Sequence, residues 1–156
     1  DLYACRSDLG GGVLRTESHE IDMITLLFGH PKQIFSTGGC RGKFDLDIED
    51  SVNLLFDYSS FSVQMSLCFM QKKQERNLKL FGQKGWIEFD LINQKLVVCS
   101  YDNEDLEVYE DIMDNDELFK LQADYFLNKF TSSDEQYLNA LERNTTIIEK
   151  SLNSTY

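Results

Sequence analysis

A glycine triplet at 10–12 is followed, within a few residues, by a histidine and by the pattern of an amphipathic helix. Apolar side chains recur there at spacings of three and four, which is the periodicity of a helix with one buried face. These side chains are Ile21, Ile24, Leu27 and Phe28. Gly29 and Pro31 end the pattern. With Ser18 as the N-cap, His19 is predicted to lie at the helix N-terminus, where the helix dipole favours an anionic or strongly polar ligand.

The middle of the chain alternates apolar runs with turn residues, which is typical of short strands. In the run 61–70 every second residue from Phe61 to Phe69 is apolar, so these side chains would share one face of a strand. Further strands are predicted at 33–36, 52–58, 78–81, 86–91, 95–101 and 106–109. The connections are too short for crossovers, so the sheet is predicted to be mostly antiparallel.

Two helices are predicted after the strands. The first begins with Asp116 and Glu117 and extends to Phe130, and the second begins near 133–136, which resembles a capping signal. The apolar positions of the second helix are Tyr137, Leu138, Leu141, Ile147 and Ile148. The order of helix, strands and two helices predicts a single α+β domain over 1–156, with helices packed on one face of a mostly antiparallel sheet.

Several strands carry neighbouring apolar residues, so apolar groups are predicted on both faces of the sheet. The pairs are Leu54 and Leu55, Leu80 and Phe81, and Val97 and Val98. A sheet face that is open to water should instead be polar. The second face is therefore predicted to meet another subunit; the alternative is that loops cover the strand ends.

Charge and composition exclude several classes of protein. A net charge of -12 repels nucleic acid and anionic membranes, since phosphate binding needs clustered Lys and Arg. No apolar run approaches the span of a bilayer and no signal peptide is recognisable, so a cytoplasmic location is expected. The four cysteines show no Cys-x-x-Cys spacing, which argues against a zinc site built from them. They are expected to be reduced structural thiols, with a disulfide framework as the alternative.

The glycine and histidine motifs also carry a family resemblance. The residues Gly10 to Leu14, Ser18 to Asp22 and the helix end before Pro31 resemble the second domain of the Gfo/Idh/MocA family of nicotinamide-dependent sugar oxidoreductases. The likeness continues in Asp47 to Asp50, in 76–88 and in the two closing helices, so it covers nearly the whole chain. Each motif is weak alone, and the combination is specific. The resemblance includes members used in bacterial surface-sugar biosynthesis.

The nucleotide-binding half of that family is not represented in this sequence. Neither its G-x-G-x-x-G turn nor its lysine-containing motif occurs, and the chain begins at Asp1. The sequence is therefore interpreted as the C-terminal, substrate-binding and oligomerisation portion of a longer enzyme. NAD or NADP would be held mainly by the missing N-terminal Rossmann domain. This chain alone is expected to bind neither a cofactor nor a metal.

His19 is the candidate catalytic residue. A neutral imidazole can shuttle a proton near neutral pH, and the resemblance implies that it acts on a sugar hydroxyl or carbonyl during hydride transfer. The alternative is a polar residue that merely begins a helix. Family members often place an aspartate four or three residues before the histidine, where this chain has Arg15 and Thr16. This departure weighs against a carboxylate-assisted mechanism.

Five further residues are candidates for substrate binding. Arg15 could hold a phosphate or carboxylate and Thr16 a hydroxyl, or both could face solvent. The resemblance implies that Tyr3 and Arg6 line the substrate cleft. Arg76 lies in a loop that could close over a substrate phosphate, with a solvated charge as the alternative. Asp22, three residues after His19, is assigned a structural role in preference to orienting the imidazole.

Two functions follow from these observations. The first is the substrate-binding domain of an NAD- or NADP-dependent oxidoreductase for a sugar or nucleotide-activated sugar, assembled as a homo-oligomer through the open sheet face. A role in bacterial surface-polysaccharide biosynthesis agrees with the resemblance. The alternative is a non-catalytic ligand-binding or dimerisation module of the same fold, in which Arg15 and Thr16 replace the usual acid.

Overall fold

The computed structural model describes residues 3–42, 46–102, 105–110, 114–128 and 135–154. The chain divides into two compact units, Asp1–Met70 with Asp134–Tyr156, and Gln71–Ser133. The expected α+β class is confirmed, and all strand pairs of the described residues are antiparallel. No helix within the described ranges has the length and apolar character needed to cross a membrane.

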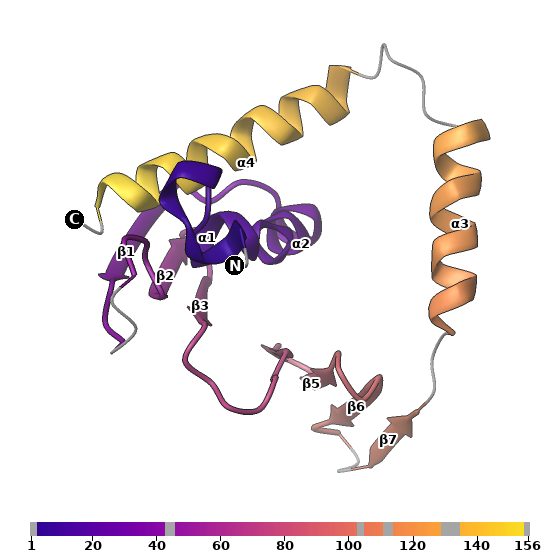
Figure 1. Ribbon diagram of the computed structural model, residues 1–156. Coiled ribbons are helices and arrows are strands. Elements are labelled where there is room, and N and C mark those ends of the chain that lie inside the picture. The colour runs from indigo at the N-terminus through magenta and orange to yellow at the C-terminus, as the bar shows by residue number, and fades with distance from the viewer. Residues whose placement is uncertain (1–2, 43–45, 103–104, 111–113, 129–134, 155–156) are drawn as a thin grey trace. The chain divides into compact units, whose positions relative to one another are not determined.

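The first unit packs helices on one face of a three-stranded sheet (Figure 1). Its strands are β1 (Gln33–Gly39), β2 (Ser51–Asp57) and β3 (Ser62–Cys68), in the order β1-β2-β3. Two short 3-10 turns, η1 (Tyr3–Cys5) and η2 (Ser7–Leu9), precede α1 (Val13–Thr16) and α2 (Ser18–Phe28). The closing helix α4 (Glu135–Asn153) contacts β1, α1 and α2.

The alternation of β2 fixes which face the helices cover. Val52, Leu54 and Phe56 are buried, whereas Asn53 and Leu55 between them are exposed. In register, Phe56 lies between Ile34 and Val63, so the covered face continues across the sheet. The helices contribute Val13, Leu14, Ile21, Ile24 and Ile147 to this core.

β1 is longer than the 33–36 predicted from the sequence, because Gly38 and Gly39 extend the ladder opposite Val52 and Ser51. A Cβ atom at Gly38 would lie 2.2 Å from the Ser51 carbonyl oxygen. Glycine therefore permits a close strand approach beyond residue 36, where the strand was predicted to end.

The second unit holds a meander of four strands and the helix α3 (Asn115–Asn128). The strands are β4 (Asn77–Phe81), β5 (Gly85–Asp90), β6 (Lys95–Ser100) and β7 (Leu106–Tyr109). Their bounds lie within one residue of the predictions. The division into two sheets was not predicted, because an alternating pattern does not specify which strands pair. The predicted helix-end residue Phe130 and the capping residues 133 and 134 lie outside the described residues.

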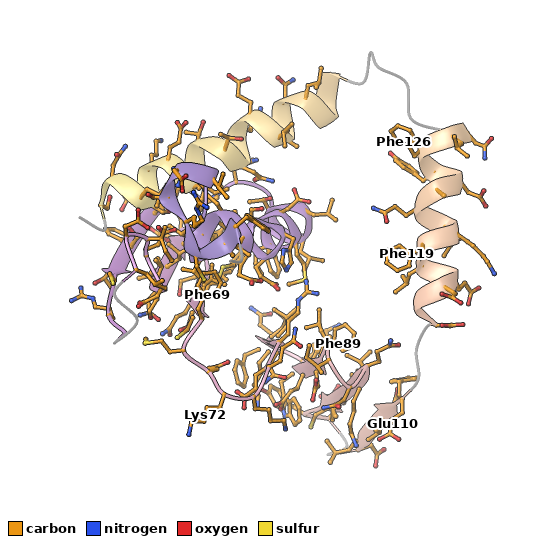
Figure 2. All side chains as sticks on the ribbon, in the orientation of Figure 1. Phe69, Lys72, Phe89, Glu110, Phe119 and Phe126 are labelled. Atoms are coloured by element: carbon orange, nitrogen blue, oxygen red, sulfur yellow. The ribbon has the colours of Figure 1, made fainter. Side chains whose placement is uncertain are left out.

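The two units differ in burial. Every fully buried apolar side chain among the described residues belongs to the first unit. On α3, Phe119 and Phe126 are more than 60% exposed, at 68% and 63%, and Figure 2 shows them projecting from the same side of the helix. The second unit thus presents apolar surface that the described residues do not cover.

A buried polar network joins α2 to α4. The Asn144 side chain donates to Asp22 Oδ1 over 2.6 Å, and the Thr25 hydroxyl donates to Asn144 Oδ1 over 2.9 Å. Asn144 and Thr25 are both buried. These contacts agree with the structural role predicted for Asp22.

We expect Asn144→Ala to lower the free energy of unfolding by about 1–3 kcal/mol, because Asp22 and Thr25 would lose their buried partner. Asn139, exposed on the same helix, supplies the control. Asn139→Ala makes the same change in helix propensity without breaking this network. Urea unfolding of both variants measures the difference. Equal stabilities would show that the network contributes nothing.

Candidate functional site

The glycine triplet forms a tight turn whose amides are taken by protein acceptors. The Gly11 N–H donates to the Arg6 carbonyl over 2.8 Å and the Gly12 N–H to the Ala4 carbonyl over 2.9 Å. The Val13 N–H then donates to the Glu49 carbonyl, and the Leu14 N–H to Glu49 Oε1 over 3.2 Å. A buried carboxylate therefore caps α1 from within the protein.

Glycine is required here for packing. Gly12 has φ 115°, and a Cβ atom on it would lie 2.4 Å from Glu49 Oε1. A Cβ atom on Gly11 would lie 2.6 Å from the carbonyl oxygens of Tyr3 and Ala4. The turn does not fit a dinucleotide pyrophosphate, because its amides are engaged and Glu49 would repel an anion.

The acidic run Asp47 to Asp50, seen in the sequence only as part of a resemblance, ties three segments together. Asp47 accepts hydrogen bonds from the Ser7 side chain and backbone, and the Ser7 hydroxyl lowers the pKa of the Asp47 carboxyl. The fully buried Asp50 accepts from the Arg41 N–H over 2.8 Å and the Gly42 N–H over 2.7 Å. The hydrogen bonds of Asp47 and Asp50 therefore hold the loops that neighbour the glycine turn.

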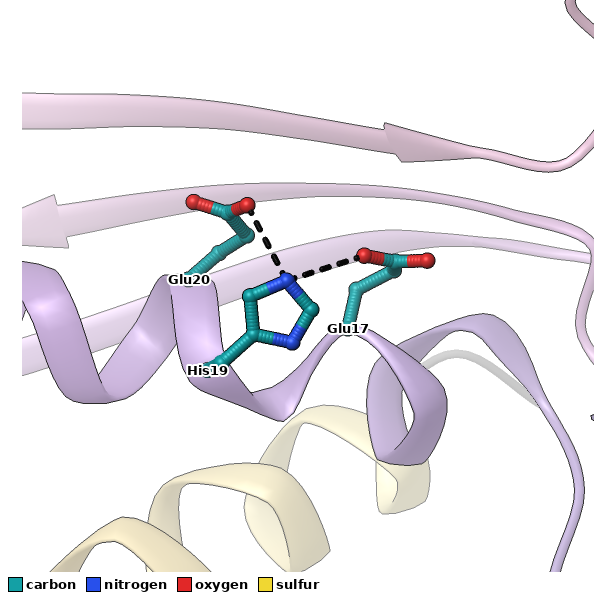
Figure 3. A group of neighbouring side chains, drawn as sticks. All are labelled: Glu17, His19 and Glu20. Atoms are coloured by element: carbon teal, nitrogen blue, oxygen red, sulfur yellow. Dashed lines mark ion pairs between the residues drawn. The ribbon is translucent and has the colours of Figure 1, made fainter. Parts of the chain in front are cut away.

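His19 lies in the first turn of α2, beside two carboxylates (Figure 3). Its Nε2 atom is 3.3 Å from Glu17 Oε2 and 3.3 Å from Glu20 Oε1. The His19 side chain is 52% exposed, and that of Glu20 13%. The imidazole can therefore be reached from solvent, while its acidic neighbours are more enclosed.

The break between α1 and α2 explains this arrangement. Glu17, with φ -97° and ψ 25°, ends α1 and is the N-cap residue of α2. The prediction that Ser18 is the N-cap was wrong: the helix already includes Ser18, and no side chain caps it. In a continuous helix, residues two apart face different directions, so the break allows Glu17 and His19 to converge. The sequence indicated His19 as a candidate but not the two glutamates, although they lie within two residues of it.

Of the predicted substrate-binding residues, Tyr3, Arg6, Arg15 and Thr16 belong to the same unit as His19, and Arg76 belongs to the other. Arg15 is exposed and donates to the Gly11 carbonyl over 3.3 Å. Thr16 Oγ1 is buried, with no hydrogen-bond partner among the described residues. Contact between a substrate and that hydroxyl would require the end of α1 to move.

Tyr3 and Arg6 lie in and just after η1 on the surface. Tyr3 is 57% exposed. Arg6 donates to both carboxylate oxygens of Asp8, over 2.9 and 2.6 Å, and this hydrogen bonding raises the pKa of Arg6. A substrate anion would have to compete with Asp8 for the guanidinium.

The exposed imidazole can exchange a proton with a ligand, and the adjacent carboxylates can stabilise the resulting positive charge. The same three side chains bring their ligand atoms within 4.8 Å of one another, which makes them the candidate metal ligands among the described residues.

The four cysteines are free thiols, as the sequence predicted, and Cys68 and Cys99 lie in strands.

Comparison with solved structures supports the fold assignment. The chain resembles UDP-N-acetylglucosamine 3-dehydrogenase GnnA from Acidithiobacillus ferrooxidans, with 14% identity and a TM-score of 0.68, over 88% of this chain and 45% of that one. A protein from Desulfitobacterium hafniense, described as an NADPH-dependent oxidoreductase, matches with 15% identity and a TM-score of 0.69, over 94% and 46%.

A third match is the super-repressor mutant of Gal80p from Saccharomyces cerevisiae, with 15% identity and a TM-score of 0.70, over 97% of this chain and 50% of that one. The chain thus spans about half the length of each of these structures. At these identities the likeness concerns the fold alone.

Sequence comparison identifies the family. No curated protein sequence gives a significant match. The sequence model of the GFO/IDH/MocA C-terminal domain matches residues 3–88, which include the glycine turn, His19 and strands β1 to β4. Because this match covers more than half of the chain, the protein belongs to the GFO/IDH/MocA family through its C-terminal domain.

Proposed function

We propose that this chain is the substrate-binding and subunit-contact half of an NAD(P)-dependent oxidoreductase acting on a sugar or nucleotide-activated sugar. Membership of the family supports the proposal. A second support is that this chain matches somewhat less than half of the length of two structures described as an oxidoreductase and a dehydrogenase. The dinucleotide belongs to a separate Rossmann domain in this proposal, since the glycine turn binds its own protein. The free thiols agree with a cytoplasmic location.

The observation that carries the proposal is the imidazole of His19 between two carboxylates. During oxidation of the substrate, His19 Nε2 would accept the proton of the reacting hydroxyl. Glu17 and Glu20, each 3.3 Å away, would stabilise the imidazolium that forms. Arg15 and Thr16 occupy the places where the family often has an aspartate, so in this chain the acids at 17 and 20 would take over that role.

Substrate binding is assigned to the exposed side chains of the same unit. Arg15 and Arg6 would attract a phosphate of a nucleotide-activated sugar, and Tyr3 offers an aromatic face and a hydroxyl. For Arg76, which belongs to the other unit, substrate binding stays a prediction from the sequence alone. Steady-state kinetics of a His19→Asn variant, in the polypeptide that includes the nucleotide-binding domain, tests the assignment.

A non-catalytic module remains the second candidate. The likeness to a super-repressor mutant of Gal80p favours this candidate, because that protein is named for repression and has a similar fold. The buried Thr16 hydroxyl agrees with this alternative. A complete polypeptide that binds a sugar ligand and shows no turnover with NAD or NADP would decide in its favour.

The subunit contact is assigned to one face of the four-stranded sheet. A row of Phe81, Trp86, Cys99 and Leu106 crosses the sheet on this face. Phe81 is 72% exposed and Leu106 60%. Apolar area of this kind is stabilised when a second copy covers it.

We expect light scattering to give a mass above the 18.1 kDa of one chain. Phe81→Glu should return the protein to a single-chain mass, because a charge would have to be buried in the interface. Gln83→Glu makes the same charge change in the exposed turn next to Phe81 and should leave the assembly intact. A wild-type protein that stays monomeric at high concentration would rule out this interface.

A further inference from the structure

We propose that Glu17, His19 and Glu20 form a binding site for a divalent transition-metal ion, with Zn²⁺ as the representative. The ligand atoms are one imidazole nitrogen and two carboxylate oxygens, which lie within 4.8 Å of one another. Imidazole and carboxylate are both ordinary zinc ligands. The inference goes beyond the proposed function and does not depend on it.

The distance from the His19 nitrogen to each carboxylate oxygen is compatible with a metal ion that both share. Both carboxylate oxygens are 3.3 Å from the same Nε2 atom, longer than the roughly 2.7–2.9 Å of charge-assisted N–H···O hydrogen bonds. An N–H shared between two acceptors at this distance would make only weak hydrogen bonds to both. A zinc ion forms bonds of about 2.0–2.2 Å to such atoms, so two ligands on neighbouring corners of its tetrahedral shell lie roughly 3.3–3.6 Å apart, which fits the distance from Nε2 to each carboxylate oxygen.

Charge favours a cation at this place. Glu17 and Glu20 each bring a carboxylate to the site. The N-terminus of α2 contributes a partial positive charge of only about half a unit, which is less than the full charge of one carboxylate. Attraction is strengthened at Glu20, whose side chain is only 13% exposed and is therefore poorly screened by water.

The surroundings leave the ion accessible. Three protein ligands do not complete the tetrahedral shell that zinc prefers, and an open fourth position is typical of non-structural zinc sites. The His19 and Glu17 side chains are 52% and 35% exposed, so water or a ligand hydroxyl can occupy that position. Figure 3 shows both carboxylates turned toward the same nitrogen of the ring.

The test uses the two histidines of the sequence, which give two sets of imidazole resonances in proton NMR. Zn²⁺ added at constant pH should shift the His19 resonances and leave those of His30 unchanged. A His30→Gln variant lacks the His30 resonances and so assigns the remaining signals to His19. It is also the matched control, in which the zinc affinity at His19 should be unchanged. The readout also separates this site from zinc binding by the four free cysteines, which would not move the His19 signal.

Glu17→Gln and Glu20→Gln keep the size of each side chain and remove its charge. Each should weaken zinc binding at His19 by at least about 10–100-fold, which is the cost of losing even an outer-shell partner of a metal ligand. Circular dichroism confirms that the variants are folded. The proposal is overturned if Zn²⁺ leaves the His19 resonances unmoved, shifts both histidines alike, or binds both variants as tightly as the wild type.

Zinc binding and the proposed proton transfer require the same Nε2 atom, so each excludes the other. That consequence alone rests on the proposed function. Because the NMR titration needs no turnover, it can fail while His19 is catalytic, or succeed while the protein is not an enzyme.

Discussion

His19→Asn should lower kcat by about 10²- to 10⁴-fold in the polypeptide proposed above, which joins this chain to a nucleotide-binding domain, because this is the usual contribution of a general acid–base group. Asparagine keeps a polar side chain but cannot exchange a proton at neutral pH. The His19 side chain is 52% exposed, so the melting temperature should change little. Turnover and melting temperature must be measured on the same preparation.

His30→Asn is the matched control. His30 lies just after α2, and its pKa is lowered by burial and by the nearby Arg143 charge, so it belongs to a different environment. This variant should keep near-normal turnover. If His19→Asn also keeps its turnover with the natural substrate, the proton must be carried by another residue, such as Arg15, Thr16 or a group in the nucleotide-binding domain.

The carboxylates give a second, smaller set of expectations. If Glu17 and Glu20 stabilise the imidazolium, Glu17→Gln and Glu20→Gln should lower kcat more than they raise KM, because the positive charge exists only after proton transfer. A change confined to KM would instead place these acids in substrate binding.

Local signals explain why most elements were predictable. The helix α2 follows from apolar residues spaced by three and four, and Gly29 ends it as expected. The strands β5, β6 and β7 were found within one residue, because each is a short apolar run between turn residues. These patterns act over a few residues, and tertiary contacts did not override them.

Features fixed by distant residues were not predictable in the same way. The separate helix α1 exists because Glu49, 35 residues from Leu14, satisfies its first amides. The break at Glu17, with φ -97° and ψ 25°, lets Glu17, His19 and Glu20 meet. The sequence could indicate that His19 begins a helix, but not that two carboxylates turn toward it. Likewise, the pairing of Asp22 with Asn144 spans 122 residues.

The glycine turn leads to the second large effect. Gly12→Ala should destabilise the protein by about 2–6 kcal/mol, from backbone strain at φ 115° and the loss of the buried Glu49 hydrogen bond. The added Cβ atom would lie 2.4 Å from Glu49 Oε1, and Glu49 is only 2% exposed, so the carboxylate has little room to withdraw. Urea unfolding measures the loss.

Gly10→Ala separates the two causes. Gly10 also has a positive φ, of 77°, but a Cβ atom there meets nothing within 4 Å. That variant should therefore cost only the left-handed strain, about 1–2 kcal/mol. The difference between the variants reports the contact with Glu49. Combining Gly12→Ala with Glu49→Ala should cost less than the sum of the single changes, because the carboxylate that the methyl group displaces is already gone. Additive losses would mean that the triplet is needed for its backbone conformation and not to admit Glu49. In that case the internal capping of α1 would no longer explain why this turn binds its own carboxylate in place of a phosphate.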